Sequence, residues 1–552
     1  MKYFDNNTWF WILVSGILFV PGLGGVHLFD WDEINFAELA REMVVTGKYL
    51  QLQINFESFT EKPPFFFWLQ ALSMKVFGIG EFAARFPNAL LGMVVVPFLY
   101  ISGKFLIDRR FGFIWAMCWF GSILPFLYFK SGIIDPYFNF FIFSGLFFLI
   151  HYIWKKSNYR DLYFSKTTAI YLWLAGIFTG LAILTKGPVG YLLIVLTITG
   201  MWLNRRLGQL FPLLSLIRFS LITLLVFSLW FMADLILNGP DFIIEFTIRQ
   251  WELLTREDAG HGGFPGYHLV VLLLGCFPAS ALAIRGLGKF PELAYHVKDF
   301  QKWMITLLIV VVVLFSLVGT KIIHYSSLAY YPISFLAALS LWNIYEKKIP
   351  QPPWAVVLTV VTGILVLAAS VILPWIGQNP EAIASLLEND DFARANLQAE
   401  VNWTGVDYVP AVFYALVLIS YLLLLRRQTY HAWRVLFFGT AAWVMLALVF
   451  FVAKIEAYSQ RAAVEFFKAQ DARAVYVTTF GYKSYVPWFY TAVQPYENPK
   501  ASDKDWLLYG AVDKPVMIST KITRRIEIEQ RIPDAELIGE ANGFLFYRRN
   551  PG

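Results

Sequence analysis

A charged pair stands directly before an aromatic helix in the stretch Glu57–Gln70, ESFTEKPPFFFWLQ. Proline is well tolerated in a first helical turn, so a helix is expected to begin at Pro63 and Pro64. The partial positive charge of that helix end and the ammonium of Lys62 add at one point, which should attract an anion. The alternative interpretation is a weak surface pair between Glu61 and Lys62.

Acidic residues lie in two separate segments that could face this point. The sequence FDWDEINF contains Asp30, Asp32 and Glu33, and KSGIIDPYFNF contains Asp135. Each segment precedes a predicted helix, so Asp32 and Asp135 could simply cap those helices. Acids at membrane depth are costly and tend to face a cavity or a partner, which favours a functional role.

The composition is that of an integral membrane protein. Of 552 residues, 58% are hydrophobic and 15% are charged, and the mean hydropathy is +0.56. Apolar runs of about the 20 residues that a membrane-spanning helix needs recur along the chain. They predict about thirteen spans, at about 8–26, 82–103, 111–129, 135–154, 168–185, 187–204, 212–238, 267–284, 303–318, 327–345, 355–375, 409–425 and 435–453.

Basic residues in the short loops predict the orientation, and the net charge of +6 reports this bias without indicating a nucleic-acid partner. With the N-terminus in the cytoplasm, every cytoplasmic loop is basic. The basic residues of these loops are Lys104, Arg109, Arg110, Lys155, Lys156, Arg160, Lys166, Arg205, Arg206, Arg285, Lys289, Lys298, Lys302, Lys347, Lys348, Arg426, Arg427 and Arg434.

Three lysines fall on the outer side, where short loops are usually poor in lysine: Lys62, Lys186 and Lys321. Lys186 could instead close its helix by charge. Together with the acids, these lysines form a set that can deprotonate a hydroxyl and hold a phosphate.

The outer side carries two further predicted units. In the first outer loop, 27–81, the sequences WDEINFAELAREMVVTGKYL and FFFWLQALSMKVFG predict amphipathic helices lying on the membrane. The tail, 454–552, alternates strand-like runs, AVYVTTFGY, PVMIST and GFLFYRR, with the helix-like KITRRIEIEQRI. It predicts a small α/β domain that follows a transmembrane domain of residues 1–453.

The cysteines and histidines give no metal signature. Cys118 and Cys276 fall inside predicted spans, which excludes a disulfide framework and a Cys-x-x-Cys zinc pattern. The spacing of the outer histidines specifies neither zinc nor magnesium. No essential metal or other cofactor is therefore predicted, and a divalent ion is left open.

The outer-loop motifs resemble those of a known enzyme family. The run DEINFAELAREMVVTGKYL, followed by FTEKPPFFFWLQALSMKVFGIGEFAARFPNAL, is similar to the first outer loop of bacterial GT-C glycosyltransferases related to protein O-mannosyltransferases and to aminoarabinose lipid A transferases. The similarity extends through LTKGPVGYLL, FPGYHLVVLLLGCFP and GTKIIHYSSLAYYPISFLAAL. It implies a polytopic α-helical GT-C fold in a bacterial inner membrane, with a periplasmic C-terminal domain.

The resemblance also implies a reaction and roles for residues. Members of the family move a sugar from a polyprenyl-phosphate donor to an envelope acceptor, which can be lipid A, a protein or a glycan. Asp32, with Glu33 and Asp135, would be the catalytic acids. The donor phosphate would be bound by Lys62, Lys186, Lys321 and Tyr325. Glu61 and His261 are candidates for contacts to substrate or metal.

One departure and two alternatives accompany this interpretation. Relatives commonly carry Arg where this chain has Asn35, which bears on the identity of the donor sugar. A lipid-linked sugar transporter or flippase would also be polytopic and bind a lipid phosphate. Such proteins tend to show inverted repeats and ionisable residues at the midplane, and neither is seen here. A polysaccharide ligase using a diphosphate-linked glycan is the second alternative.

Overall fold

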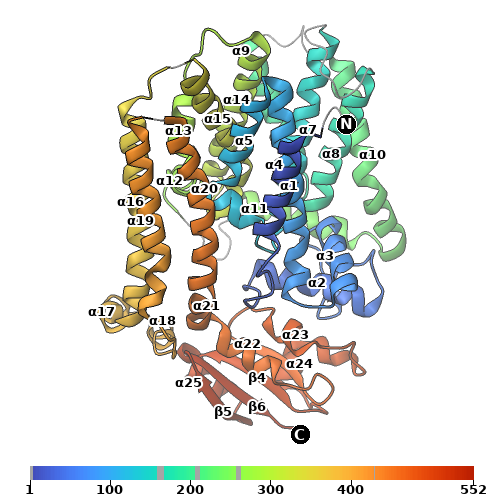
Figure 1. Cartoon of the computed structure of the whole chain (residues 1–552). Coiled ribbons are helices and arrows are strands. Elements are labelled where there is room, and N and C mark those ends of the chain that lie inside the picture. The colour runs from blue at the N-terminus through green and yellow to red at the C-terminus, as the bar shows by residue number, and fades with distance from the viewer. Residues whose placement is uncertain (1–3, 158–166, 206–211, 256–262, 348, 428) are drawn as a thin grey trace.

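A bundle of long helices carries a small mixed domain at one end (Figure 1). The fold is that of a computed structural model, which describes residues 4–157, 167–205, 212–255, 263–347, 349–427 and 429–552. The bundle helices are α1 (Asn6–Phe19), α4 (Glu81–Leu106), α5 (Arg109–Phe120), α6 (Ile123–Tyr128), α7 (Asp135–Lys156), α8 (Thr168–Lys186), α9 (Val189–Arg205), α10 (Leu213–Asn238), α12 (Tyr267–Gly275), α13 (Ala279–Gly286), α14 (Tyr295–Leu317), α15 (Tyr330–Glu346), α16 (Pro353–Gln378), α19 (Val409–Leu425) and α20 (Thr429–Ala447).

Every predicted span falls on a helix or a helix pair, but the count of about thirteen is not confirmed. Within the described ranges, eight helices are long and apolar enough to cross a membrane, or nine when one bent pair is taken as a single span. That pair, α12 and α13, bends by 114°. The predicted span 111–129 is likewise divided into α5 and α6 at Gly121 and Ser122. The length and hydropathy of a segment show that it is apolar, but they do not show where the helix bends or ends within it.

Helix α7 is the centre of the bundle. Its residues from Asp135 to Trp154 are all buried, as expected for a helix that is apolar on every side. Aromatic rings fill the surrounding space, and the ring of Phe143 stacks on Tyr331 of α15 with centroids 4.2 Å apart. Helices α10 and α16 instead expose large apolar side chains such as Leu229 and Val357, as lipid-facing helices do.

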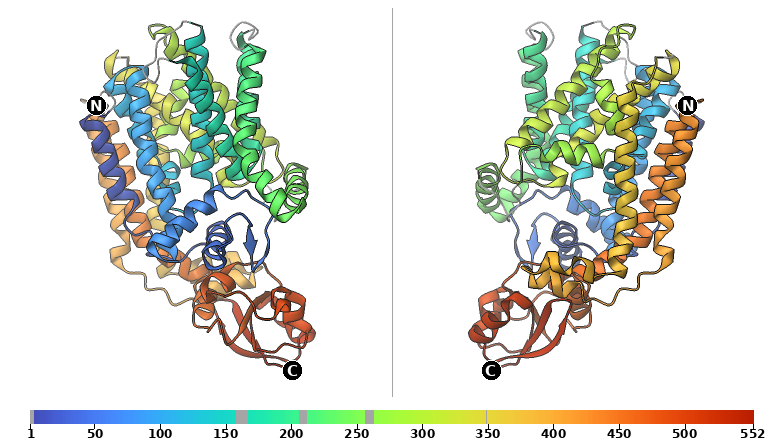
Figure 2. Two further views of the ribbon diagram at one scale, coloured as in Figure 1. Left: turned by 90° about the vertical axis from the view of Figure 1, so that its right-hand side faces the viewer. Right: turned by 90° about the vertical axis from the view of Figure 1, so that its left-hand side faces the viewer.

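The end of the bundle that meets the C-terminal domain is called the outer end. It carries α2 (Asp32–Thr46), the hairpin of β1 (Gln53–Ile54) and β2 (Glu57–Ser58), α3 (Phe65–Phe77), α11 (Asp241–Thr255), the short helices α17 (Glu381–Ala384) and α18 (Asp391–Asn396), and the turn η2 (Ile323–Ala329). Figure 2 shows α2 and the hairpin between the bundle and the C-terminal domain.

The prediction that α2 lies on the membrane surface is wrong. Residues Glu33 to Met43 are all buried, because the C-terminal domain covers the polar face of the helix. Arg41 pairs with Glu38 at 2.6 Å and donates to the carbonyl of Val493 in that domain at 2.7 Å. Helix α3 begins after Pro64, as predicted, and keeps an exposed apolar face that includes Leu72 and Val76.

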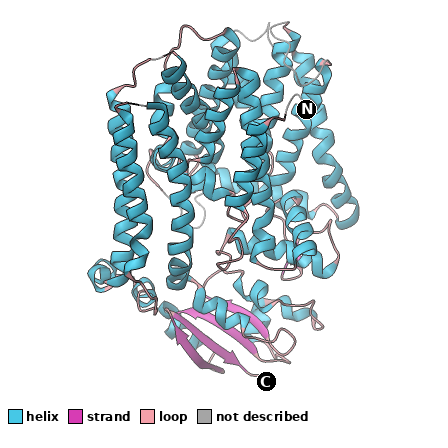
Figure 3. Ribbon diagram, viewed as in Figure 1, coloured by secondary structure: helices cyan, strands magenta, loops and turns pink. Residues whose placement is uncertain are grey.

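The C-terminal domain is built on a four-stranded sheet (Figure 3). Its strands are β3 (Tyr476–Phe480), β4 (Val516–Lys521), β5 (Ala535–Ala541) and β6 (Phe544–Arg549), and its helices are α21 (Ala453–Ser459), α22 (Arg461–Lys468), α23 (Val486–Thr491), α24 (Lys504–Tyr509) and α25 (Arg525–Arg531). The strand order is β3-β4-β6-β5, with only the pair β3 and β4 parallel.

Three of these strands lie where the sequence predicts them, and β5 was missed because its exposed, mixed sequence AELIGEA has no strand pattern. Helix α21 continues from α20 through one π-helical turn, Leu448–Val452, so no linker separates the bundle from the domain. The boundary near residue 454 stays a prediction.

Replacing Arg41 by Ala tests the packing of the C-terminal domain on α2. The variant leaves Glu38 buried without its partner and removes the bond to Val493, which should cost about 3–5 kcal/mol. Thermal unfolding in detergent should show a lower midpoint, and limited proteolysis should release the C-terminal domain faster. The exposed Arg548 provides a control, since Arg548→Ala should change stability by less than about 0.5 kcal/mol. Equal midpoints for the two variants would contradict this account of the packing.

Candidate active site at the outer end

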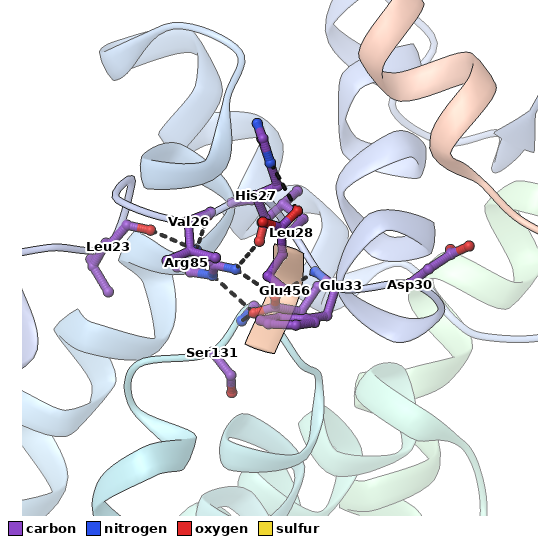
Figure 4. A network of polar contacts seen from close by, with 12 residues as sticks. Leu23, Val26, His27, Leu28, Asp30, Glu33, Arg85, Ser131 and Glu456 are labelled. Atoms are coloured by element: carbon purple, nitrogen blue, oxygen red, sulfur yellow. Dashed lines mark hydrogen bonds and ion pairs between the residues drawn. The ribbon is translucent and has the colours of Figure 1, made fainter. Parts of the chain in front are cut away.

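A buried ion pair fixes the start of α2 (Figure 4). Arg85 of α4 donates to both carboxylate oxygens of Glu33, at 3.0 and 2.7 Å. Its remaining N–H groups reach the carbonyls of Leu23, Val26 and His27 in the loop after α1. Glu33 also accepts the backbone N–H of Phe29 and Gly132. Separate parts of the chain therefore meet at one carboxylate.

The C-terminal helices hold the same loop from the other side. His27 Nδ1 lies 3.0 Å from Glu456, which also pairs with Arg461. Gln460 accepts the N–H of Asp30 at 3.0 Å and donates to the carbonyl of Leu28. Asp30 itself points away from the Arg85 network (Figure 4). The loop that leads to Asp32 is thus held by both the bundle and the C-terminal domain.

Asp32 is the first residue of α2 and makes no capping hydrogen bond, so its geometry does not support the capping alternative. Its Oδ2 lies 3.4 Å from Nε2 of His324 in η2, and its side chain is 44% exposed. Burial lowers the pKa of His324, so its imidazole is neutral at pH 7 and can hold Asp32 as a hydrogen-bond donor. Asp32 is therefore an accessible carboxylate with a positioned partner.

Asp135 and Lys186 form a second pair beside Asp32. Asp135 begins α7 without capping it, and its Oδ1 accepts from Lys186 Nζ at 2.6 Å. Its Oδ2 is buried and has no partner among the described residues. The ammonium of Lys186 also faces the ring of Tyr325, 5.5 Å from its centroid. Lys186 therefore binds a carboxylate across the bundle rather than merely ending α8.

Lys62 supplies a further positive charge and does not form the predicted surface pair. Its Nζ donates to the backbone carbonyl of Glu61 at 3.3 Å, whereas the Glu61 carboxylate faces Lys483 of the C-terminal domain at 3.8 Å. In the described ranges, no carboxylate lies within ion-pair distance of Lys62. Burial lowers the pKa of Lys62, and the charges of Glu61, Lys186, Asp32 and Arg249 act on the same ammonium.

Two candidates occupy positions other than those expected. Lys321 donates to the carbonyls of Phe315, Ser316 and Val318 and so closes the end of α14. Glu33, expected among the catalytic acids, has both oxygens engaged by Arg85. Their contacts favour structural roles, because each polar group is already satisfied by the protein.

The comparisons with known proteins point to one group of sugar transferases. The family of dolichyl-phosphate-mannose-protein mannosyltransferases matches residues 61–231. An undecaprenyl phosphate-α-4-amino-4-deoxy-L-arabinose arabinosyl transferase of Shewanella sediminis is 24% identical over 414 residues, which cover 71% of this chain and 69% of that protein.

Solved structures show the same fold over the whole chain. ArnT from Cupriavidus metallidurans, crystallised with undecaprenyl phosphate, has a TM-score of 0.74 at 18% identity and covers 99% of this chain and 100% of its own. An oligosaccharyltransferase of Archaeoglobus fulgidus has a TM-score of 0.51 at 11% identity and covers 95% of this chain and 71% of its own.

The chain is a GT-C glycosyltransferase of the O-mannosyltransferase and aminoarabinose-transferase type. The fold and the family resemblance derived from the sequence are confirmed, and the roles of individual residues stay predictions. His261, a candidate contact of this glycosyltransferase, lies outside the described residues.

Sequence reasoning missed several parts of the glycosyltransferase site. His324 lies three positions after Lys321, yet no pattern paired it with Asp32. Arg249 and Lys483 are also basic residues on the outer side, so the loop-charge argument that selected the three lysines could have selected them too. The ion pair of Arg85 with Glu33 could not be predicted from the sequence pattern, because the two residues are 52 positions apart in the chain.

Among the described residues, no set of side chains forms a metal-binding site. Glu61, the candidate ligand, faces Lys483. Across the described ranges, no cluster of three or more His, Cys, Asp or Glu side chains is placed to hold a metal ion. The contacts of Glu61 are thus those of an ion pair with the C-terminal domain.

Asp30 predicts a pH-dependent stability. Burial raises the pKa of its carboxyl to about 6, above the usual value of about 3.9. Folding therefore favours the protonated form, and this stabilisation is lost as the pH rises from about 4 through 6. Asp30→Asn should unfold at the same temperature as wild type at pH 4 and at a higher temperature at pH 7.5. The gain in the free energy of unfolding at pH 7.5 should be at most about 3 kcal/mol. A gap between the two proteins that does not change with pH would refute this prediction.

Proposed function

We propose that this glycosyltransferase moves a sugar from an undecaprenyl-phosphate-linked donor to a hydroxyl or phosphate group of an envelope acceptor, which can be lipid A, a protein or a glycan. The observation that carries the proposal is the cluster of Asp32, Asp135, Lys62 and Lys186, which brings the accessible carboxylate of Asp32 close to two ammonium groups, one of them held by Asp135. The similarity to the undecaprenyl phosphate-α-4-amino-4-deoxy-L-arabinose arabinosyl transferase of Shewanella sediminis supports this class of donor.

In the proposed reaction, an acceptor oxygen attacks the anomeric carbon of the donor sugar. The bond from that carbon to the phosphate oxygen breaks, and the electron pair leaves with the lipid phosphate. A sugar-bearing phosphodiester carries one negative charge, whereas the released monophosphate carries nearly two. We assign Lys62 and Lys186 to this added charge, and stabilising it would lower the barrier. A single displacement of this kind inverts the anomeric configuration.

Asp32 is proposed as the base toward the acceptor. It is more exposed than the acids around it, so an oxygen nucleophile can approach. Nε2 of His324 lies 3.4 Å from Oδ2 of Asp32 and can orient the carboxylate toward an acceptor hydroxyl. Asp135, bound to Lys186, acts through that lysine by fixing its ammonium.

The location of the site favours an enzyme over a transporter. Its charges lie at helix ends, in α2 and in η2, and not at the middle of interrupted helices, where transporters bind their cargo. We place the outer end in the periplasm of a bacterium and the N-terminus in the cytoplasm. Basic residues such as Arg109, Arg110 and Lys347 gather at the opposite end of the bundle, which supports this orientation.

Asp32→Asn tests the catalytic role. Purified wild type and variant are incubated with a bacterial envelope extract, and the polyprenyl lipids are followed by mass spectrometry. Wild type should convert a glycosylated lipid monophosphate to the bare lipid phosphate, and the mass lost identifies the sugar. Losing the base should slow this step about 10²- to 10⁴-fold.

The control is Asp391→Asn, which alters an exposed carboxylate of α18 and should leave the rate unchanged. Full activity of Asp32→Asn would remove Asp32 from the reaction. If wild type converts no lipid although donors and acceptors are present, the transporter alternative gains support.

A further inference from the structure

A buried amide lies one helical turn after Asp135 on α7. Asn139 follows Asp135 by four positions, so the two side chains project from the same side of the helix, about 6 Å apart along its axis. The side chain of Asn139 is only 6% exposed. A polar group buried in a membrane-spanning helix is costly unless it is hydrogen-bonded, and amides in such helices commonly bond to a neighbouring segment.

The partner of Asn139 is Ser327 in the turn η2. Nδ2 of Asn139 donates to Oγ of Ser327 at 2.7 Å, and Oγ of Ser327 donates in turn to the backbone carbonyl of His324. A hydroxyl has one proton, and the carbonyl takes it, so Oγ is left as an acceptor for the amide N–H. The two bonds therefore run in one direction and join α7 to the main chain of His324.

The ring of His324 extends this path to the proposed base. Its Nε2 lies 3.4 Å from Oδ2 of Asp32 at the start of α2. The imidazole is 20% exposed, whereas the side chain of Asp32 is 44% exposed, so the enclosed group supports the open one. Asn139, Ser327, His324 and Asp32 thus form a continuous path from a bundle helix to the accessible carboxylate.

The turn that carries His324 is of a type with weak internal hydrogen bonds. η2 is a 3₁₀ helix, in which hydrogen-bond geometry is poorer than in an α-helix. Lys321 secures the chain before the turn by donating to carbonyls at the end of α14. Asn139 secures the turn itself from α7. The position of the imidazole therefore depends on bonds made from outside the turn.

We propose that Asn139 and Ser327 are positioning residues for the transfer reaction. They hold His324 in place and, through its ring, orient the carboxylate of Asp32. This inference rests on the proposed function of Asp32 as the base toward the acceptor. Neither residue touches the reacting atoms, so both act on the rate through His324.

The same side of α7 also holds a group assigned to the leaving phosphate. Asp135 accepts from Lys186 at 2.6 Å, and Asn139 reaches η2 from the next turn. In a single displacement, the attacking and leaving oxygens lie on opposite sides of the anomeric carbon. The separation between the base and the ammonium must then be held closely, because small misplacements of reacting groups are costly. One turn of α7 provides that fixed separation.

Removing both polar groups together tests the positioning role. Asn139→Leu combined with Ser327→Ala leaves no buried donor unpaired, so the thermal unfolding midpoint in detergent should stay close to that of wild type. The rate of lipid-donor conversion in the envelope extract should fall about 10- to 100-fold. The affinity for undecaprenyl phosphate should be unchanged, since Lys186 keeps its partner. Rates are expressed per molecule that binds undecaprenyl phosphate, so a loss of folded protein is not counted as a loss of rate.

Asn343→Leu provides the matched control. Asn343 is also a buried amide of a bundle helix, but it donates to the carbonyl of Leu339 within its own helix. The control should convert donor at the wild-type rate. A wild-type rate in the doubly substituted protein, or a loss of undecaprenyl phosphate affinity as large as the loss of rate, would overturn the proposal.

A His324→Ala background shows whether the two residues act through the imidazole. With the ring absent, Asn139→Leu and Ser327→Ala should cost no further rate, because coupled residues are not additive. A further loss as large as the one seen with His324 present would mean that they act by another route, and the positioning role would be wrong.

This inference and the proposed function can fail separately. If Asp32→Asn keeps full activity, the base lies elsewhere and both are wrong. If Asp32→Asn is inactive while the doubly substituted protein converts donor as wild type does, the proposed reaction stands and the role of Asn139 and Ser327 is wrong.

Discussion

The ion pair between Glu33 and Arg85 sets the position of Asp32, on which the candidate site depends. Asp32 precedes Glu33 in the chain, so the carboxylate that faces outward is carried by a residue whose neighbour is locked inward. The guanidinium of Arg85 is fully engaged by the two Glu33 oxygens and three backbone carbonyls. A buried pair of this kind requires such complete satisfaction, because an unpaired charge in its place would be strongly destabilising.

This constraint explains why the C-terminal domain and the bundle form one site. The loop 27–30 is held by Arg85 on one side and by Glu456 and Gln460 on the other. Helix α2 is then enclosed by the domain through Arg41. Lys483 reaches the same region from the loop after β3. A sheet that is distant in sequence therefore contributes charge within reach of the first outer loop.

Much of this arrangement could be predicted from the sequence. Apolar runs located the bundle helices, Pro63 and Pro64 marked the start of α3, and the loop charges picked out Lys62 and Lys186. What escaped prediction depends on long-range pairing: the inward burial of α2, the engagement of Glu33 by Arg85, and the use of Lys321 to close α14. Periodicity showed that α2 is amphipathic, but it could not show that protein, rather than water, would cover the polar face.

The central claim, that Lys62 and Lys186 together hold the phosphate of a polyprenyl lipid, can be measured directly. Protein with ¹⁵N at its lysine side chains is loaded with undecaprenyl phosphate, and ³¹P–¹⁵N dipolar couplings are recorded by solid-state NMR. Charge-assisted contacts place Nζ within about 4.5 Å of phosphorus. The account predicts couplings to two ammonium groups, one lost in Lys62→Met and the other in Lys186→Met. A bound lipid with no such coupling, or couplings that persist in both variants, would contradict it.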